Sequence, residues 1–381
     1  MHHIILNTES FFGNGCVSKI GAEAVERRFR RAFIVTDKNL IKFGTLRPVI
    51  ASLQSGAVEY AIFDEVQPNP TIAAVQSGVE RFVQSGCDFI IAVGGGSPID
   101  TAKAISVVAA NPEHADVRSL EHAGQTPNRG VCLFAVPTTA GTASEVTIDY
   151  VITDEERERK FLCADDNCIP RVAFIDAEMM AGMPQPLAAA TGMDALTHAI
   201  EAYCSRRAWT MTDIFALQAV DCIAKHLKLS CTLPLARENM ALGQYLAGMA
   251  FSNCGLGACH ALAHPLSAVH HVAHGVANAI MLPHVMEFNA EATGDRYKAI
   301  AKAMGIHKTA DMRPEQFRAK AVTAVRDLSK LVGIPQSLRD VGVSRDSFER
   351  MAKMAVEDAC AANNPRPLHT GNALALYEKA F

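Results

Sequence analysis

Short runs of hydrophobic residues, separated by amphipathic stretches, fill the first half of the chain. Five of these runs are continuous rather than alternating, and they lie at residues 31–37, 58–64, 87–93, 131–137 and 171–177. Continuous runs rich in Val, Ile and Phe are typical of strands with both faces buried. The stretches between them, such as 71–86, repeat their apolar residues at helical spacing. This alternation predicts a parallel sheet covered by helices on both faces, and the segments 149–154 and 159–165 predict an added β-hairpin.

The strand pattern stops near residue 182, where long helical patterns rich in Ala, Leu and Met begin. These residues favour helices, and Gly- or Pro-containing segments separate one helical pattern from the next. Since Met183 and Pro184 lie in an apolar stretch, we expect a compact junction there. These patterns therefore predict an α/β N-terminal domain at 1–182 and an all-α C-terminal domain at 183–381.

Composition narrows the classes of function. The chain has 381 residues, of which 49% are hydrophobic and 20% charged, and its net charge is −4. The negative balance argues against a nucleic acid or an anionic membrane as partner. The basic run 26–31 does not change this, because Val25 and Phe29 are four residues apart and would supply the buried side of a helix that exposes the run.

Cysteine usage and the absence of apolar targeting segments predict the compartment. The eleven cysteines form no CxxC pair, which argues against a disulfide framework and favours a reducing environment. The N-terminal residues lack a signal-peptide pattern, and no apolar run reaches the roughly 18 residues of a membrane helix. We therefore expect a cytoplasmic protein that does not cross a membrane.

A glycine-rich loop follows the third predicted strand and precedes a helical pattern. Gly94–Gly96 would let the backbone approach an anion at the start of the helix, with Ser97 as its N-cap and Pro98 as its first residue. The loop predicts a pyrophosphate site, although Ile99 stands where the dinucleotide fingerprint has its third glycine. A tight turn that binds no ligand is the alternative.

Two further polar positions follow predicted strands. Asp37 ends the first of them, and an acidic residue there can bind the adenosine ribose and disfavour a 2′-phosphate, which favours NAD over NADP. In the usual order the acid follows the glycines, whereas Asp37 precedes Gly94. The loop 136–145 offers several threonine hydroxyls after another strand. Both positions are also compatible with ordinary turns.

Histidines are concentrated in one segment of the second half. Residues 260–274 hold five of the fourteen histidines, and His260 and His264 are about one helical turn apart. Upstream, Asp194 and His198 have the same spacing in an apolar helical pattern. Burying a carboxylate and an imidazole is costly unless they are paired or bound to a metal. Two such helices predict a site for Fe(II), Zn(II) or a similar ion, with an exposed polar patch as the alternative.

Together these motifs resemble the iron-containing (group III) alcohol dehydrogenases. The similar segments are GMDALTHAIEAY, HALAHPLSAVHHVAHGVANAIMLPHVMEFN, GGGSPIDTAKAI, PNPT and PTTAGTASEVT, and the resemblance covers essentially the whole chain. It implies a dehydroquinate synthase-like architecture, a homodimer, NAD and Fe(II) as cofactors with Zn(II) also suitable, and interconversion of a small primary alcohol or diol with its aldehyde. The segments VTDKNL, RKFLCAD and ALGQYLAGMAFSN are most similar to the subgroup that acts on lactaldehyde and propane-1,2-diol.

The resemblance also implies a set of site residues. The metal ligands fall on Asp194, His198, His260 and His274. The NAD contacts fall on Asp37, Asn69, Gly95, Gly96, Ser97, Thr138, Thr139, Thr142 and Lys160. The substrate pocket would include Phe251, Cys360 and Asp149, the last at a position where the subgroup carries Asn. An additional family histidine falls on His264, for which we expect a catalytic proton-relay role because histidine titrates near neutral pH. His270 and His271 lie outside this pattern.

Three alternatives remain at this stage, namely a polyol oxidase of the glycerol dehydrogenase type, a lyase of the dehydroquinate synthase type, and a non-enzymatic metal- or nucleotide-binding protein. The anionic substrate of the lyase would require Lys and Arg near the metal, and none flanks Asp194 or the segment 260–274. For the expected dimer, the stretch 2–7 could pair between two subunits as an edge strand.

Overall fold

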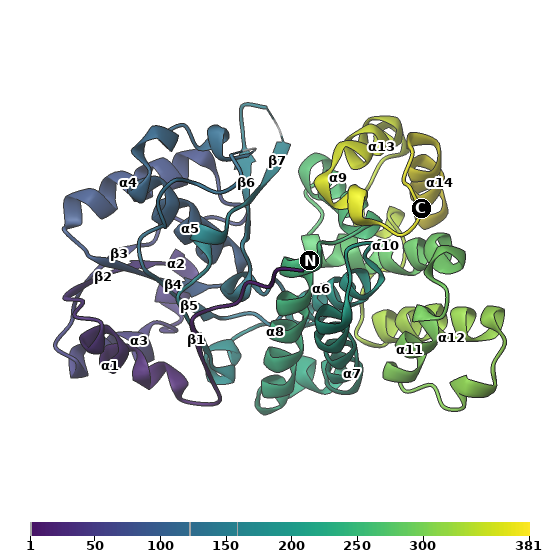
Figure 1. The fold of residues 1–381 in the computed structure, drawn as a ribbon, viewed down its shortest axis with the longest axis horizontal. Helices are drawn as coiled ribbons and strands as arrows, with labels where there is room; N and C mark the ends of the chain where they lie inside the picture. Colours follow the sequence, from purple (N-terminus) through teal and green to yellow (C-terminus); the bar gives the residue numbers. More distant parts are fainter. Residues whose placement is uncertain (1, 122, 158) are drawn as a thin grey trace. The chain divides into compact units, whose positions relative to one another are not determined.

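A computed structural model describes residues 2–121, 123–157 and 159–381 of the chain. It divides the chain into two compact units, of which the first comprises residues 1–139 and 143–183 and the second 140–142 and 184–381. Figure 1 shows the first unit largely in purple to teal and the second in green to yellow. The functions predicted for the domains 1–182 and 183–381 stay predictions.

Six parallel strands form the main sheet of the first unit, in the order β1-β8-β5-β4-β2-β3. They are β1 (Glu9–Phe12), β2 (Arg31–Val35), β3 (Glu59–Phe63), β4 (Phe89–Gly94), β5 (Leu133–Pro137) and β8 (Val172–Ile175). The five predicted strands are confirmed as β2, β3, β4, β5 and β8. The sequence analysis missed β1, which is only four residues long and largely exposed. Residues 2–7 form no strand, and their pairing between subunits stays a prediction.

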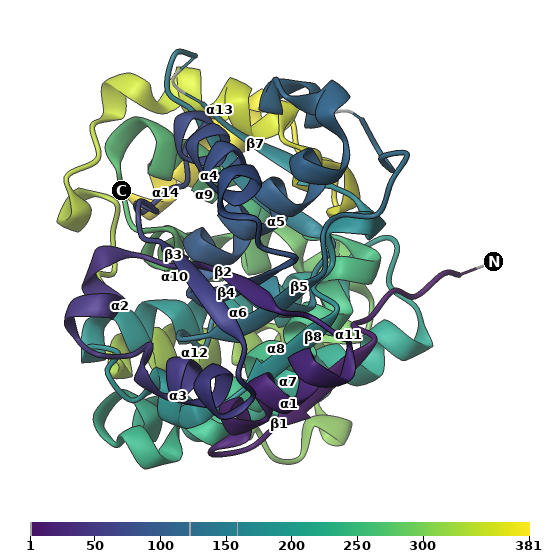
Figure 2. The same ribbon diagram turned by 90° about the vertical axis from the view of Figure 1, so that its left-hand side faces the viewer.

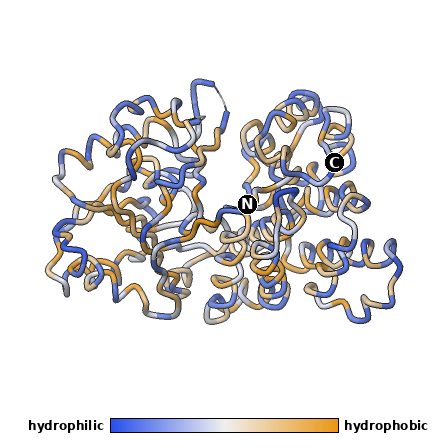
Figure 3. Tube along the Cα trace, viewed as in Figure 1, coloured by the Kyte–Doolittle hydropathy of each residue, from blue (hydrophilic) through white to orange (hydrophobic). Residues whose placement is uncertain are grey.

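Helices cover both faces of this sheet, as the alternating pattern predicts. Buried residues of α4 (Ile72–Ser85) and α5 (Gly96–Ala110) share a core with Phe33 and Ile90, whereas those of α1 (Ile20–Glu26) and α3 (Arg47–Ser55) share another with Ile34 and Ile91. Because successive strand residues point to opposite faces, both faces of β2 and β4 are apolar. Figure 2 shows the strands between these two helix pairs, and Figure 3 shows hydrophobic strands joined by more hydrophilic segments.

Local structure in the first unit corrects two expectations. The basic run 26–31 does not lie along a helix, because α1 ends at Glu26, Arg28 has a φ of 63°, and Arg31 begins β2. Of the two residues predicted to form the buried side, Val25 is 52% exposed, whereas Phe29 packs against the core. Ser97 is not the N-cap of α5, because the helix already begins at Gly96 and Gly95 caps it. The predicted hairpin is confirmed as β6 (Asp149–Asp154) and β7 (Arg159–Ala164).

The second unit is helical, which confirms the predicted fold class. Its α-helices are α6 (Gln185–Cys204), α7 (Thr210–Thr232), α8 (Arg237–Cys254), α9 (Ala258–His270), α10 (His274–Asn289), α11 (Arg296–Ala303), α12 (Pro314–Leu331), α13 (Phe348–Glu357) and α14 (Thr370–Ala380). The first unit also contains α2 (Lys38–Lys42). The helix α6 is buried over most of its length and packs against α7, α8 and α10. Within the described residues, no helix has the length and apolar character needed to cross a bilayer.

Candidate active site

One face of α6 carries three buried ionisable side chains. Asp194, His198 and Glu201 follow one another at intervals of four and three residues, so they lie on the same side of the helix. All three are buried, and the surrounding α6 residues are mainly Ala, Leu and Ile. Burial of three such groups costs free energy unless they find partners, and those partners come from α9 and α10.

His260 on α9 and His274 at the start of α10 complete the cluster. One ligand-type atom from each of Asp194, His198 and His260 lies within 4.8 Å of the other two. Asp194 Oδ1 is 3.8 Å from His260 Nε2 and 3.6 Å from His274 Nε2. The structure therefore brings together all four predicted metal ligands, which come from three helices of the second unit.

The electrostatics of this cluster fit a divalent cation. His198 Nδ1 and His260 Nε2 are buried and have no hydrogen-bond partner. Burial lowers the pKa of His198 to about 4, so its imidazole is neutral at neutral pH and keeps its lone pair. Burial alone would raise the pKa of Asp194, but its charge interactions with His198 and the other imidazoles outweigh burial and lower that pKa. A carboxylate with three imidazoles is a donor set that suits Fe(II) or Zn(II).

Side chains around the cluster orient its members. Glu201 Oε2 lies within hydrogen-bond distance of His260 Nδ1, at 2.6 Å. Asn278, one helical turn after His274, donates from Nδ2 to Asp194 Oδ1 at 2.7 Å. The sequence analysis missed both residues, although each lies at helical spacing from a predicted ligand. Hydrogen bonds to ligand side chains of this kind fix ring orientation and tune metal affinity.

His264 lies beside the cluster and has a carboxylate partner of its own. Its ring stacks against that of His274, with centroids 5.4 Å apart, and its Nδ1 is 2.7 Å from Asp358 Oδ2. Burial would raise the pKa of Asp358, but the charge and hydrogen bond of His264 lead the effects that lower it to about 2. Asp358 is 94 residues from His264, so no local pattern in the sequence indicates this pairing.

Two of the three predicted pocket residues lie against these histidines. The ring of Phe251 on α8 stacks on His198 with centroids 4.4 Å apart. Cys360, in a short 3-10 helix at Ala359–Asn363, has its Sγ within 4.8 Å of ligand-type atoms of His264 and Asp358. The third, Asp149, begins β6 in the first unit, where its carbonyl oxygen accepts a 2.7 Å hydrogen bond from the buried Lys103.

His270 and His271 take no part in the cluster. His270 Nε2 is 2.6 Å from Ser347 Oγ, and His271 is exposed at the end of α9 with a φ of 55°. The dense histidine segment thus serves different purposes along its length. His260 and His274, the first and last histidines of the segment, face Asp194, whereas His270 and His271 lie outside the cluster.

The predicted cofactor contacts in the first unit lie where neighbouring parallel strands end. Asn69 follows β3, Asp37 follows β2, Gly95, Gly96 and Ser97 follow β4, and Thr138 and Thr139 follow β5. These four strands are adjacent in the sheet. Nucleotides bind at the carboxyl ends of strands in open α/β sheets, so the placement supports the predicted role of these residues.

Contacts between these loops hold the predicted cofactor residues together. Thr138 N donates to Gly94 O at 2.9 Å, and a Cβ on Gly95 would come within 3.1 Å of the Thr139 side chain. Lys160 on β7 donates from Nζ to Asn69 Oδ1 at 2.7 Å. Burial lowers the pKa of Lys160 to about 8.

Two predicted cofactor residues are placed differently from the rest. Asp37 is the N-cap of α2, and its Oδ1 accepts hydrogen bonds from the backbone of Asn39 and Leu40 at 2.8 and 3.0 Å. Asp37 therefore has a structural role in addition to the predicted contact with ribose. Thr142 belongs to the short segment 140–142 that clusters with the second unit.

Known proteins are similar to this chain over its full length. The family model for iron-containing alcohol dehydrogenase matches residues 7–177, and the model for the C-terminal part of the same family matches 188–381. A lactaldehyde reductase from Escherichia coli (strain K12) is 50% identical to this chain, and the alignment covers 100% of both proteins. A 1,3-propanediol dehydrogenase from Klebsiella pneumoniae is 40% identical, and the alignment covers 100% of this chain and 99% of that protein. A crystal structure of a 1,3-propanediol oxidoreductase superposes with a TM-score of 0.96 at 40% identity, covering 100% of both chains.

Proposed function

Since the chain belongs to the iron-containing alcohol dehydrogenase family, we propose that this oxidoreductase interconverts propane-1,2-diol and lactaldehyde with NAD. The observation that carries this proposal is the convergence of Asp194, His198, His260 and His274 on one cluster, of which the first three are buried. The 50% identity to a lactaldehyde reductase over the full length of both chains supports the choice of substrate. Family membership favours this reaction over the lyase and the non-enzymatic alternatives.

The four clustered side chains would hold the cation, which we propose to be Fe(II), with Zn(II) suited to the same donors. When bound, the cation would act as a Lewis acid toward the oxygen of the alcohol or aldehyde, an effect worth several kcal/mol. Phe251 covers one face of His198 and would keep water away from that ligand. Asn278 would hold the carboxylate of Asp194 in place through its 2.7 Å hydrogen bond.

His264 is the proposed proton carrier. Because its Nδ1 is engaged by Asp358, its Nε2 remains to exchange a proton with the substrate hydroxyl or with water. The side chain is 18% exposed, so the ring is in contact with solvent. Cys360 lies beside this pair and would form part of the wall that the substrate contacts.

The strand-end loops of the first unit would bind the dinucleotide, which supplies the hydride-transfer chemistry when bound. The backbone at Gly95, Gly96 and Ser97 opens α5, and the start of a helix favours a pyrophosphate. Lys160 and Asn69 would bind a further part of the cofactor as a hydrogen-bonded pair. Asp37 would disfavour the 2′-phosphate of NADP. A cytoplasmic homodimer is part of the same proposal.

A substrate panel on metal-defined protein tests this function. Metal-free protein reloaded with Fe(II) or Zn(II) is assayed for NAD reduction with propane-1,2-diol, ethylene glycol, glycerol and ethanol. We expect the highest kcat/KM with propane-1,2-diol and loss of activity in EDTA. A preference for glycerol would favour a polyol oxidase, and inactivity with every alcohol after Fe(II) loading would overturn the proposal.

The variant Asp149→Asn tests the pocket position at which this chain departs from the related subgroup. The lost carboxylate makes the position less polar, so we expect kcat/KM to change by about 3- to 10-fold toward the less polar alcohols, a shift on the order of 1 kcal/mol. The ratio of kcat/KM for ethanol and for propane-1,2-diol measures this effect. An unchanged ratio would place Asp149 outside the pocket.

A further inference from the structure

The buried carboxylate of Glu201 links the proposed metal cluster to the helix that supplies His260. Its Oε2 lies 2.6 Å from His260 Nδ1, and its Oε1 accepts a 2.6 Å hydrogen bond from the backbone N–H of Cys259. We propose that Glu201 is the positioning residue of the metal centre, which fixes the orientation and the tautomer of His260 and thereby sets the affinity for the cation. This inference rests on the proposed metal site but not on the identity of the substrate.

The hydrogen bonds at Glu201 determine which nitrogen of His260 is protonated. Backbone N–H groups face both carboxylate oxygens, that of Cys259 at 2.6 Å and that of His260 at 3.4 Å, so both oxygens act as acceptors. His260 Nδ1 must then be the donor in its short contact with Oε2. The lone pair consequently resides on Nε2, the buried atom without a hydrogen-bond partner that lies 3.8 Å from Asp194.

The same carboxylate fixes where α9 begins. The first N–H groups of a helix have no partners within the helix, and Gly257 at the N-cap of α9 has no side chain that could accept from them. Glu201 accepts from Cys259 N instead, and Asn364 Oδ1 accepts from Ala258 N at 3.1 Å. A Cβ at Gly257 would lie 2.9 Å from both acceptor oxygens. Since Glu201 shares α6 with Asp194, this cap sets His260 in register with the first two ligands.

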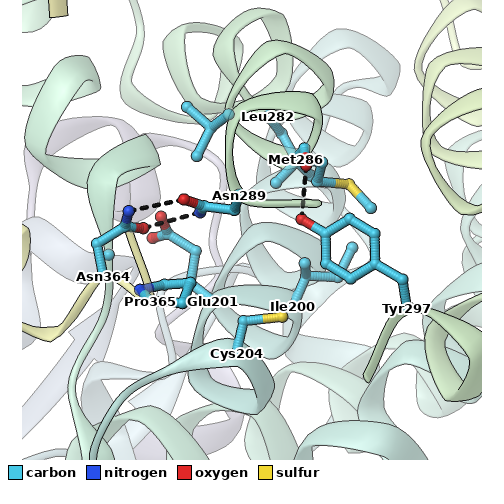
Figure 4. Close-up of a pocket in the computed structure, with 11 residues that line it drawn as sticks. Ile200, Glu201, Cys204, Leu282, Met286, Asn289, Tyr297, Asn364 and Pro365 are labelled. Atoms are coloured by element: carbon cyan, nitrogen blue, oxygen red, sulfur yellow. Dashed lines mark hydrogen bonds between the residues drawn. The ribbon is translucent and has the colours of Figure 1, made fainter. Parts of the chain in front are cut away.

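A small pocket beside Glu201 shows that the cap is itself supported. Glu201, Asn289 and Asn364 line this pocket (Figure 4), and none of the four proposed ligands does. The amides of Asn289 and Asn364 exchange two hydrogen bonds, of 2.9 and 2.7 Å. Asn364, the second acceptor at the N-terminus of α9, is therefore held in place by Asn289 from the side on which the pocket lies.

The charge balance around Glu201 also favours a cation. Among the described residues, its ion-pair partner is His260 alone, and Asp194 is a second buried carboxylate in the same cluster. Two buried carboxylates in one cluster are costly unless positive charge compensates them. A divalent cation on Asp194 and the imidazoles, with Glu201 behind His260, balances both carboxylates and forms the carboxylate–histidine–metal arrangement of many metal sites.

The variant Glu201→Gln tests the inference, because an amide cannot replace both acceptors. If its NH₂ group faces His260, Nδ1 has to accept and the ring proton moves to Nε2, where it blocks metal binding. If the NH₂ group faces Cys259, two donors meet at the start of α9. We expect the Kd for Zn(II), measured on metal-free protein by competition with a chromophoric chelator, to rise by about 10- to 100-fold. A Kd equal to that of the wild type would overturn the proposal.

Asp165→Asn provides the matched control. Asp165 is also a buried carboxylate, but it lies in the first unit and accepts hydrogen bonds from Thr126 and Asn167. Its loss should lower stability and leave the Kd for Zn(II) unchanged. Equal weakening of Zn(II) binding in both variants would mean that a general loss of stability, rather than the tautomer of His260, explains the Glu201→Gln result.

A measurement on the wild type keeps the inference testable even if Glu201→Gln fails to fold. Nitrogen-15 NMR of the Zn(II)-loaded protein, with His260→Gln used for assignment, should show His260 protonated at Nδ1 and bound to the cation through Nε2. Coordination through Nδ1 would overturn the proposal. The outcome is independent of catalysis, because a protein that binds Zn(II) in this way and oxidises no alcohol would contradict only the proposed function.

Discussion

Each side chain of the cluster is held in its own way. Asp194 receives a hydrogen bond from Asn278, His260 donates one to Glu201, and His198 packs face to face with Phe251. Removing a proposed ligand and removing the residue that orients it should therefore lower the affinity for the cation by different amounts. Loss of a ligand removes a bond to the cation, whereas loss of an orienting residue leaves that bond in a poorer geometry.

The pair Asp194→Asn and Asn278→Ala tests this distinction. Asp194→Asn removes the only carboxylate among the proposed ligands, so we expect Zn(II) affinity to fall by more than about 100-fold. Asn278→Ala keeps the donor set, so we expect a loss within the range of about 10- to 100-fold that orienting residues show. Isothermal titration with Zn(II) measures both. Wild-type affinity in Asp194→Asn would refute the ligand assignment.

Lys160 should make NAD binding depend on pH. Burial lowers its pKa to about 8, so the amine is charged below that pH and neutral above it. Because the dinucleotide is anionic, we expect its Kd to rise as the pH rises from 7 to 9.5. Fluorescence titration with NAD measures the Kd, and Lys160→Met should bind more weakly at pH 7 with a flat profile across this range. The same slope in both proteins would mean that another group is responsible.

The metal-site residues of α6 could be predicted from the local sequence pattern. Asp194 and His198 stand out because two polar groups at helical spacing interrupt an apolar pattern. Glu201 continues the same face and could have been found by extending the argument by one turn. Asp358 and Asn364 could not, because they reach His264 and the start of α9 from 94 and 106 residues away. Tertiary contacts of this separation leave no periodic signal.

At the scale of elements, small residues let α6 and α10 approach closely. A Cβ at Gly275, the residue after His274, would lie 2.3 Å from the backbone oxygen of Ala190 on α6. Real Cβ contacts are not this short, so a side chain here would have to push the two helices apart. The position of His274 relative to Asp194 therefore depends on a glycine that itself contributes no ligand.

The variant Gly275→Ala should weaken metal binding without touching a ligand. We expect the displaced helix to cost about 1–3 kcal/mol of stability and to lower Zn(II) affinity by moving His274. Gly371→Ala is the control, because Gly371 lies in α14 with nothing within 4 Å of its would-be Cβ. It should stabilise the protein by up to about 1 kcal/mol. Chemical denaturation and Zn(II) titration of both variants measure these effects.

Strands were easiest to predict where burial is uniform, and the predictions failed where details of the backbone decide the structure. The strands β2, β4 and β5 are buried along almost their whole length, so their sequences are unambiguous. The edge strand β1 is largely exposed and has no comparable apolar run. The N-cap of α5 is Gly95 rather than the predicted Ser97, because glycine can precede a helix without a side-chain cap. Helix propensity alone does not distinguish between these two N-cap positions.

At the scale of the whole molecule, the two proposed cofactors would bind to separate compact units. The proposed metal ligands all lie in the second unit, and the proposed NAD contacts, apart from Thr142, lie in the first. A ligand that binds only the folded form stabilises it by an amount set by its concentration relative to its Kd. Each cofactor should therefore protect mainly the unit that holds its site.

Hydrogen exchange measured by mass spectrometry tests this division. With free Zn(II) at 100 times its Kd, the site gains about 2.7 kcal/mol, so amides of α6, α9 and α10 that exchange through opening of the site should exchange about 100-fold more slowly. Saturating NAD should instead protect the loops that follow β4 and β5. Metal-free protein with an excess of EDTA gives the baseline. If Zn(II) slowed exchange equally in both units, their opening would be one cooperative event, and protection could no longer assign the cation to the second unit. Protection confined to the strand-end loops would place the cation outside the histidine cluster altogether.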